Sequence, residues 1–258
     1  MAGKFVWFDL NTTDVQGAIS FYTKVVGWET EAWSGAAFPY TMFKPAGGQP
    51  LGGVNALDPE AAKRGAPSHW LGHVTVADVD AAVAKIVAAG GSALSPAMDI
   101  PMVGRMATVS DPWGAVFSVF RPAGEAPDAA AQGAMGVMCW AELMTNNIED
   151  ALAFYGDLLG WTKGDEMNGA GGRYVLMRQA GSDQSFGGVM VCPAGMERGA
   201  WMYYFSVPDL DASVALATGE GAKMHMPIID VPGGRIAMMV DPQGGNFALW
   251  SGPVASAS

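Results

Sequence analysis

The sequence predicts an α+β protein made of two tandem modules, each composed of two strand–helix–three-strand (βαβββ) units. Two observations lead to this prediction. The segment from Trp7 to Trp28 matches the segment from Trp140 to Trp161 at a constant offset, with eight identities in 22 positions, where unrelated sequences would share roughly one or two. In addition, short segments rich in aromatic and β-branched residues alternate with longer segments of helical period.

The first βαβββ unit begins with an aromatic strand expected at residues 5–10. A helix follows, because apolar side chains recur at helical spacing over residues 18–25. Thr13 or Asp14 is the expected N-cap of this helix, and Gly27 is its expected end. Three further strands are expected at residues 28–33, 40–44 and 53–56.

The second βαβββ unit repeats the pattern. We expect a strand at residues 71–76, a helix that begins after Asp78 and ends at Gly90, and two strands on either side of the turn 111–114. The second module repeats both units, and the Ala/Gly/Pro-rich stretch between the modules is typical of a linker. The expected bounds are 4–122 for the first module, 123–133 for the linker and 134–252 for the second module.

Composition argues against several classes of partner. The formal net charge is -11, so the surface repels polyanions, and we expect neither nucleic acid nor an anionic membrane as a partner. No apolar run reaches the roughly 18 residues that a membrane span needs. The two cysteines, Cys139 and Cys192, show no Cys-x-x-Cys spacing, which favours buried, reduced thiols in a cytoplasmic protein.

Repeated motifs carry a resemblance to a known family. Each module has Phe-Tyr near the end of its first helix and then Gly-Trp, as in Phe21-Tyr22 and Gly27-Trp28, and each has Asp-Pro-x-Gly before its last strand. With four βαβββ units, the chain resembles the vicinal oxygen chelate superfamily, which contains glyoxalase I, extradiol dioxygenases and bleomycin-resistance proteins. The resemblance implies strongly curved mixed sheets that form cups. The tandem glyoxalase-like members that the chain resembles most carry the label hydroxylase without a demonstrated activity, and a fold alone does not fix function.

Metal-dependent members of this superfamily place their ligands, two His and one Glu, at fixed distances from these motifs. A divalent cation of this kind prefers carboxylate, imidazole or thiolate donors. The side chains at the corresponding positions here offer none, so we expect no metal cofactor, and metal-dependent glyoxalase or dioxygenase chemistry is disfavoured. The resemblance maps the positions to Trp7, Leu71 and Ser118 in the first module and to Trp140, Met202 and Ala248 in the second.

Strand parity predicts which side chains accompany these positions, because residues two apart share a face. The resulting faces are mainly aromatic and Met-rich with a few polar groups, which is the composition of a small-molecule pocket. The alternative is that the two Trp side chains only fill the cups as core. The expected ligand-binding residues on these faces are Trp7, Trp140, Leu71, Met202, Thr75, Ser118, Phe120, Ser206, Asn246 and Trp250.

Two other repeated features have a structural explanation beside a functional one. Arg105 and Arg235 could reach a ligand anion at the mouth of a cup, although pairing with the preceding Asp99 and Asp230 is the favoured alternative. The glycine pairs at 52–53 and 187–188 precede no helix start, so they favour a bulge or a close strand approach over a phosphate site.

Polar residues on the same faces form two candidate acid/base pairs. If their strands are neighbours, the Asp9 carboxylate could orient the His73 imidazole for proton transfer. Glu142 and Tyr204 stand at the equivalent positions, with a carboxylate as base and a phenol as acid. The alternative is that each is a satisfied structural pair, or that His73 faces outward.

Functions from different classes follow from these patterns. The favoured one is a metal-free protein that binds a small, partly aromatic or apolar molecule, as the bleomycin-resistance branch does. The alternative is a metal-independent lyase, isomerase or hydroxylase acting on a carbonyl-containing or polyketide-like substrate. A scaffold that only contacts another protein would leave the inward polar groups without a role. Fusion of two modules in one chain predicts a monomer or a homodimer.

Overall fold

The first module follows the predicted order of elements. The computed structural model describes residues 3–35, 39–124, 134–169 and 172–252 of the 258-residue chain. Asp14, one of the two N-cap candidates that the sequence offers, caps the first helix by accepting a hydrogen bond from the Gly17 N–H. The elements are β1 (Phe5–Thr12), α1 (Val15–Val25), β2 (Glu29–Ala32), β3 (Thr41–Lys44), β4 (Gly52–Ala56), α2 (Pro59–Lys63), β5 (His69–Thr75), α3 (Val79–Ala88), β6 (Ser92–Ala93), β7 (Met98–Ile100), β8 (Gly104–Ser110) and β9 (Val116–Pro122).

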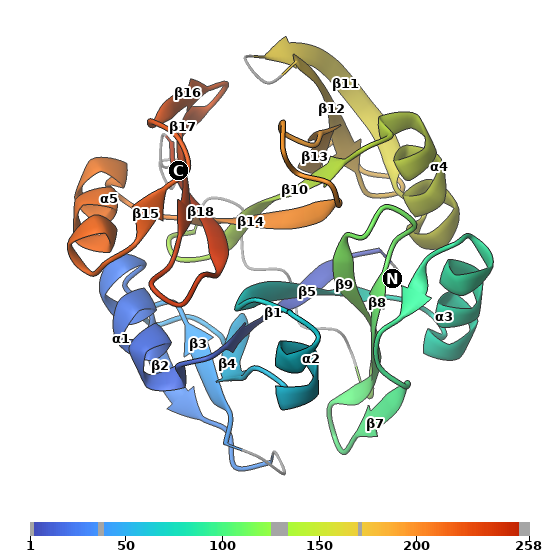
Figure 1. Ribbon diagram of the computed structural model, residues 1–258, viewed down its shortest axis with the longest axis horizontal. Helices are drawn as coiled ribbons and strands as arrows, with labels where there is room; N and C mark the ends of the chain where they lie inside the picture. Colours follow the sequence, from blue (N-terminus) through green and yellow to red (C-terminus); the bar gives the residue numbers. More distant parts are fainter. Residues whose placement is uncertain (1–2, 36–38, 125–133, 170–171, 253–258) are drawn as a thin grey trace. The chain divides into compact units, whose positions relative to one another are not determined.

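The second module repeats this series in its described residues, except for the short helix α2 (Figure 1). The sequence analysis missed the short elements α2, β6 and β7 and the second module's equivalents of β6 and β7, because two to five residues carry too little periodicity to be recognised. The elements are β10 (Met138–Thr145), α4 (Ile148–Leu159), β11 (Thr162–Gly169), β12 (Gly172–Arg178), β13 (Ser185–Val191), β14 (Ala200–Ser206), α5 (Leu210–Gly219), β15 (Lys223–Met224), β16 (Ile229–Val231), β17 (Gly234–Val240) and β18 (Asn246–Ser251).

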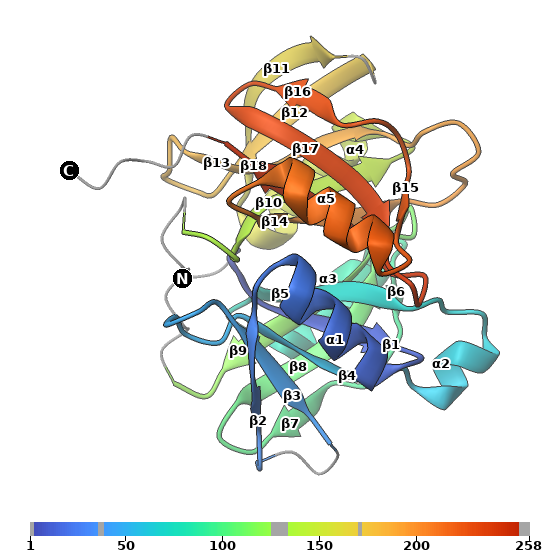
Figure 2. The same ribbon diagram turned by 90° about the vertical axis from the view of Figure 1, so that its left-hand side faces the viewer.

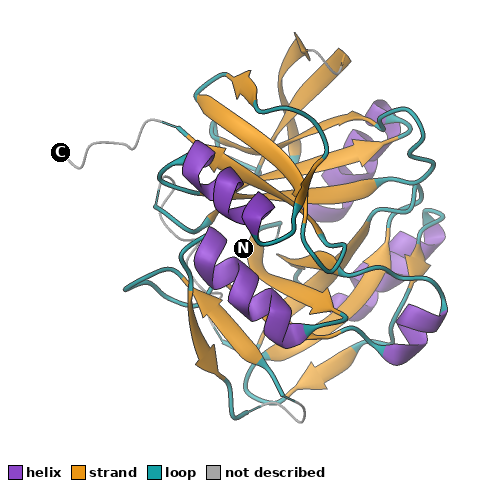
Figure 3. Ribbon diagram, turned by 60° about the vertical axis from the view of Figure 1, so that its left-hand side comes forward, coloured by secondary structure: helices purple, strands orange, loops and turns teal. Residues whose placement is uncertain are grey.

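The strands form two nine-stranded mixed sheets, one from each module, and the helices are few beside them (Figure 3). The strand order is β2-β3-β4-β1-β5-β9-β8-β6 in the first sheet and β11-β12-β13-β10-β14-β18-β17-β15 in the second, with β7 paired to β8 and β16 to β17. The two orders agree position for position. The prediction of two α+β modules with βαβββ units is therefore confirmed, whereas strong curvature and a cup shape stay predictions.

The chain forms two compact bodies, and each body contains segments of both modules. Body I consists of Met1–Val6, Gly72–Asp128 and Trp140–Met202, and body II consists of Trp7–Leu71, Ala129–Cys139 and Tyr203–Ser258. Each body thus combines one half of the first module with one half of the second. Helix α1 packs beside α5 within body II, and α3 packs beside α4 within body I (Figures 1 and 2).

A buried Trp–Tyr–Asp chain joins the two modules inside body II. The Tyr22 hydroxyl donates to Asp241 Oδ2 over 2.9 Å and accepts from Trp70 Nε1 over 2.9 Å. The other carboxylate oxygen of Asp241 accepts the backbone N–H groups of Gln243 and Gly245. We call this arrangement a latch. The Phe-Tyr motif of one module therefore binds the Asp-Pro-x-Gly motif of the other.

Body I contains the repeat-related latch. The Tyr155 hydroxyl donates to Asp111 Oδ2 over 3.0 Å and accepts from Trp201 Nε1 over 3.2 Å. Burial raises the pKa of Asp111, and likewise that of Asp241 in body II, above the usual aspartate value. Two further Trp residues also cross between the modules, because Trp28 donates to the Gly136 carbonyl and Trp161 to the Gly3 carbonyl.

Two expectations from composition have different outcomes. Cys139 and Cys192 are free thiols, but both are half-buried, so the prediction that both are buried is wrong. Cys192 lies just after the end of β13, where its Sγ contacts the Arg198 carbonyl. Among the described residues, no helix is long and apolar enough to cross a membrane. Most of the expected linker, residues 125–133, lies outside the described residues.

Candidate functional site

An indole, a phenol and a carboxylate form a hydrogen-bonded cluster on β1 in body II. The Trp7 indole Nε1–H points to the Tyr40 hydroxyl over 2.7 Å and to Asp9 Oδ1 over 3.0 Å, and the Tyr40 hydroxyl donates to the same Asp9 oxygen over 2.5 Å. All three side chains are half-buried. We call them the Trp7 cluster. Their contacts confirm that Trp7 and Asp9 share a face of β1, as strand parity predicts.

The environment keeps the phenol of this cluster neutral. Burial, and then the negative charge of Asp9, raise the pKa of Tyr40 far above the usual value for tyrosine. The hydroxyl therefore stays protonated and donates a hydrogen bond to the carboxylate. A neutral phenol that accepts from an indole and donates to a carboxylate fixes the orientation of both partners.

A glycine on the neighbouring strand makes room for this phenol. Gly53 on β4 lies opposite Asp9 in the parallel pairing of β1 with β4. A Cβ atom at Gly53 would lie 2.2 Å from the Tyr40 hydroxyl oxygen, and one at Gly52 would lie 2.1 Å from the Phe8 carbonyl oxygen. The expected close strand approach is confirmed for Gly52, while Gly53 serves as the seat of a side chain.

The second module carries an equivalent set, the Trp140 cluster, in body I. Trp140 Nε1 donates to the Tyr174 hydroxyl over 2.8 Å, and Tyr174 hydrogen-bonds the Glu142 side chain. Gly188 lies opposite Glu142 on the paired strand, and a Cβ atom there would lie 2.3 Å from the Tyr174 hydroxyl. Burial, and then the charge of Glu142, raise the pKa of Tyr174 well above its usual value. Both modules thus contain the hydrogen-bonded cluster and the glycine that leaves space for its phenol.

The side chains at these positions do not fit a metal ion. The indole nitrogens of Trp7 and Trp140 act as hydrogen-bond donors and offer no lone pair to a cation. Leu71 and Met202 are buried apolar side chains. Over the described residues, no group of three or more His, Cys, Asp and Glu side chains is placed to hold a metal. We therefore derive no chemistry through a metal at either cluster.

The two expected acid/base pairs are divided between the bodies. Asp9 belongs to body II and His73 to body I, whereas Glu142 belongs to body I and Tyr204 to body II. Their strands are neighbours in the sheet order, β1 beside β5 and β10 beside β14, as the hypothesis requires. His73, Glu142 and Tyr204 are all buried. The pairs themselves stay predictions.

Several expected ligand-binding residues have contacts within their own body. The Thr75 hydroxyl accepts from the Lys4 backbone N–H, and the Ser206 hydroxyl donates to the Ala134 carbonyl over 2.7 Å. Asn246 is exposed and contacts His225 through its side-chain oxygen, and Trp250 is half-buried. A binding role for these residues, and for the buried Leu71, Met202, Ser118 and Phe120, stays a prediction.

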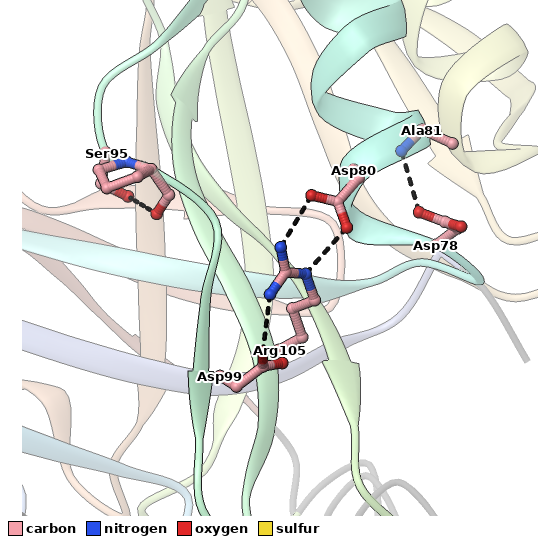
Figure 4. A network of polar contacts seen from close by, with 7 residues as sticks. Asp78, Asp80, Ala81, Ser95, Asp99 and Arg105 are labelled. Atoms are coloured by element: carbon pink, nitrogen blue, oxygen red, sulfur yellow. Dashed lines mark hydrogen bonds and ion pairs between the residues drawn. The ribbon is translucent and has the colours of Figure 1, made fainter.

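The two arginines make the structural pairs that the sequence favours. Arg105 donates through Nε and Nη2 to Asp80 and through Nη1 to Asp99, each over 2.9 Å (Figure 4). Arg235 donates through Nη1 and Nη2 to Asp211, and its Nε lies 3.7 Å from Asp230 Oδ1. The sequence analysis missed Asp80 and Asp211, which lie in the first turns of α3 and α5. Each arginine therefore links a hairpin to a helix start.

Sequence reasoning also missed the two tyrosines of the clusters. Tyr40 lies 31 residues from Asp9 in the chain, so no local pattern connects them. One signal was available: Tyr40 and Tyr174 are equivalent in the repeat, at an offset between those of the Trp and glycine positions. A tyrosine and a later glycine pair that recur together in both modules are the pattern that would have indicated the contact between the tyrosine and the first strand.

The fold and the repeated sites define a tandem-module protein, and the chain belongs to the Glyoxalase/Bleomycin resistance protein/Dioxygenase superfamily, whose family model matches residues 4–119 and 138–249. The chain is 34% identical over 246 residues to "Putative glyoxylase CFP32" of Mycobacterium tuberculosis, covering 94% of this chain and 92% of that protein. It is 32% identical over 258 residues to "Anthracycline biosynthesis protein DauV" of Streptomyces sp. strain C5, covering 96% and 92%.

Solved structures with low sequence identity share the fold. The Mn(II)-bound glyoxalase from Novosphingobium aromaticivorans matches with a TM-score of 0.62 at 18% identity, over 97% of this chain and 82% of that one. The 2,2',3-trihydroxybiphenyl 1,2-dioxygenase from Sphingomonas wittichii strain RW1 matches with a TM-score of 0.64 at 11% identity, over 98% and 91%. At these identities the likeness concerns the fold alone.

Proposed function

We propose that the chain binds a small, partly aromatic or apolar molecule against the sheet faces that carry the Trp7 and Trp140 clusters, without the metal ion used by other superfamily members. One observation carries this proposal. At the first metal-ligand position that the resemblance implies, each module has a half-buried indole, held by a phenol and a carboxylate at Trp7 and by a phenol at Trp140. Half-buried aromatic side chains with a few fixed polar groups are suited to small-molecule binding.

The relatives support a partly aromatic ligand. DauV and the equally similar DnrV of Streptomyces peucetius are named as anthracycline biosynthesis proteins. A polyketide-like molecule with fused rings has the apolar, flat surface that an indole face would bind. In the proposed arrangement, the two mixed sheets curve into cups that enclose such a molecule and remove its apolar surface from water.

Extraction of bound small molecules tests this proposal. The full-length chain is purified without added ligands and denatured, and the released compounds are identified by mass spectrometry. The proposal predicts an aromatic or apolar compound at stoichiometric amounts, which rebinds to the folded protein in an equilibrium titration. Recovery of only hydrophilic compounds that rebind would contradict it.

A second candidate function is metal-independent acid/base catalysis on a carbonyl-containing substrate, by a lyase, isomerase or hydroxylase-like reaction. The sheet order favours it, because β1 lies beside β5 and β10 beside β14, as the two candidate acid/base pairs require. The proposed pairs are Asp9 with His73 and Glu142 with Tyr204. Loss of turnover with retained ligand affinity in Asp9→Asn or His73→Ala would support this function, and unchanged turnover would exclude the first pair.

A further inference from the structure

We infer that Trp7 and Trp140 are two equivalent stacking platforms for a flat, uncharged or cationic polycyclic aromatic ligand, and that Tyr40 and Tyr174 are positioning residues that fix the plane of each indole. The inference rests on the proposed function and adds three statements to it. It names the ligand class, it sets two binding sites per chain, and it identifies residues that control affinity without belonging to the stacking surface.

The two platform indoles differ from the Trp residues of the core. Trp28 packs against Phe205 with ring centroids 5.0 Å apart, and Trp161 packs against Phe186 at 4.6 Å; both indoles are buried. Trp7 and Trp140 are only half-buried, and within the described segments neither makes an aromatic ring contact. Among the described residues, the platform indoles therefore lack the ring partners of the core indoles, and part of their surface stays exposed to water.

Hydrogen bonding fixes the edge of each platform indole. An indole has one N–H group, which acts only as a donor, and at Trp7 it is held between the Tyr40 hydroxyl and Asp9. At Trp140 the same group is held by Tyr174. A ring anchored by its edge keeps one orientation before the ligand arrives, so binding costs less side-chain entropy than at a free Trp.

The charges beside the platforms select the ligand class. Each cluster contains a carboxylate, Asp9 or Glu142, and the chain carries a net charge of -11. An anionic ligand would approach like charge at a half-buried site, where screening by water is weak. A neutral or positively charged ring system avoids this repulsion.

The repeat indicates that both platforms function. The Trp–Tyr contact measures 2.7 Å in one cluster and 2.8 Å in the other, and each tyrosine is seated over a glycine. Neither Gly53 nor Gly188 has a positive φ angle, so backbone conformation does not require glycine there. Their role is the space that they leave for the phenol.

The test is a titration of the full-length chain with 1,8-dihydroxyanthraquinone, a flat and neutral probe. Two further probes separate the contributions: anthraquinone-2-sulfonate is flat but anionic, and 1-adamantanol is neutral but saturated. We expect two molecules of the first probe per chain, quenching of Trp fluorescence, and clearly weaker binding of the other two.

Variants then test the positioning role. Tyr40→Phe and Tyr174→Phe each weaken one of the two sites about fivefold to tenfold, the value of one hydrogen bond, and leave the other site and the thermal midpoint nearly unchanged. Gly53→Ala displaces the Tyr40 phenol without removing it and weakens the same site as Tyr40→Phe. Trp113→Phe, at a half-buried indole outside both clusters, leaves both sites intact.

The outcomes separate this inference from the function on which it rests. A single site, or Tyr→Phe variants that lower the thermal midpoint while both affinities persist, would overturn the inference. Binding of 1-adamantanol as tightly as the anthraquinone would also overturn it, while the proposed binding of apolar molecules would stand. Absence of binding by either neutral probe at millimolar concentration would overturn both.

Discussion

The Tyr22–Asp241 latch predicts a large and specific loss of stability in Tyr22→Phe. The substitution removes one oxygen atom from a side chain that is completely buried. It deletes a hydrogen bond to Asp241, and it leaves the Trp70 Nε1–H without its acceptor in the core. Both modules contribute residues to this contact, so the effect concerns their joint folding.

The magnitude follows from the two lost interactions. A hydrogen bond to a carboxylate contributes about 1.5–3 kcal/mol, and an unsatisfied buried donor costs about 1–3 kcal/mol. Together they lower the free energy of unfolding by roughly 3–5 kcal/mol. For a chain of this length each kcal/mol shifts the midpoint of thermal unfolding by about 2–4 °C, so the melting temperature falls by roughly 10 °C.

Urea unfolding followed by circular dichroism, together with calorimetry, measures this loss. Tyr155→Phe removes the equivalent hydroxyl in body I and should have a similar effect. Tyr40→Phe is the matched control, because the Trp7 Nε1–H keeps Asp9 Oδ1 as an acceptor when the Tyr40 hydroxyl is lost, so this donor is not left unsatisfied. If Tyr22→Phe lost less than about 1 kcal/mol, or no more than Tyr40→Phe, the latch would not stabilise the fold as argued.

Three further predictions concern other features. Burial raises the pKa of Asp111 and Asp241 above the unfolded value, so the stability that they contribute is full in acid and declines as the pH rises through the raised pKa values. The difference in unfolding free energy between wild type and Asp111→Asn/Asp241→Asn should fall over that range, and a rise would contradict the assignment. Arg105→Ala should reduce stability in a salt-sensitive manner, through loss of the Asp80 and Asp99 pairs, and leave probe affinity unchanged; a weaker affinity would restore a ligand-binding role for Arg105. Gly160→Ala should cost about 1 kcal/mol in urea unfolding, because Gly160 ends α4 with φ +74°, and an unchanged midpoint would refute this.

Local features of the fold were predictable from the sequence. The apolar period and the caps placed the start of α1 after Thr13 or Asp14 and that of α3 after Asp78, and the structure has the caps at Asp14 and Asp78. Strand parity put Trp7 and Asp9 on one face, and their shared contact with Tyr40 confirms it. These features depend on residues only a few positions apart, which is the range over which periodicity and capping act.

Contacts between distant segments were not predictable in the same way. Tyr22 and Asp241 lie 219 residues apart, and the sequence analysis noted both motifs without recognising that they bind each other. The Tyr40–Asp9 contact depends on the order β3-β4-β1 within the sheet, which a single sequence does not specify. The division into two bodies, each with parts of both modules, follows from such long-range contacts and not from the repeat.

Elemental analysis of the full-length chain, purified without chelators, tests the central claim most directly. The claim is that hydrogen-bonded indoles stand where other superfamily members hold a metal ion, and that the chain works without one. The account predicts no stoichiometric iron, zinc, manganese or nickel in the folded protein. One equivalent of any of these metals per chain, lost in a Trp7 or Trp140 substitution, would contradict it.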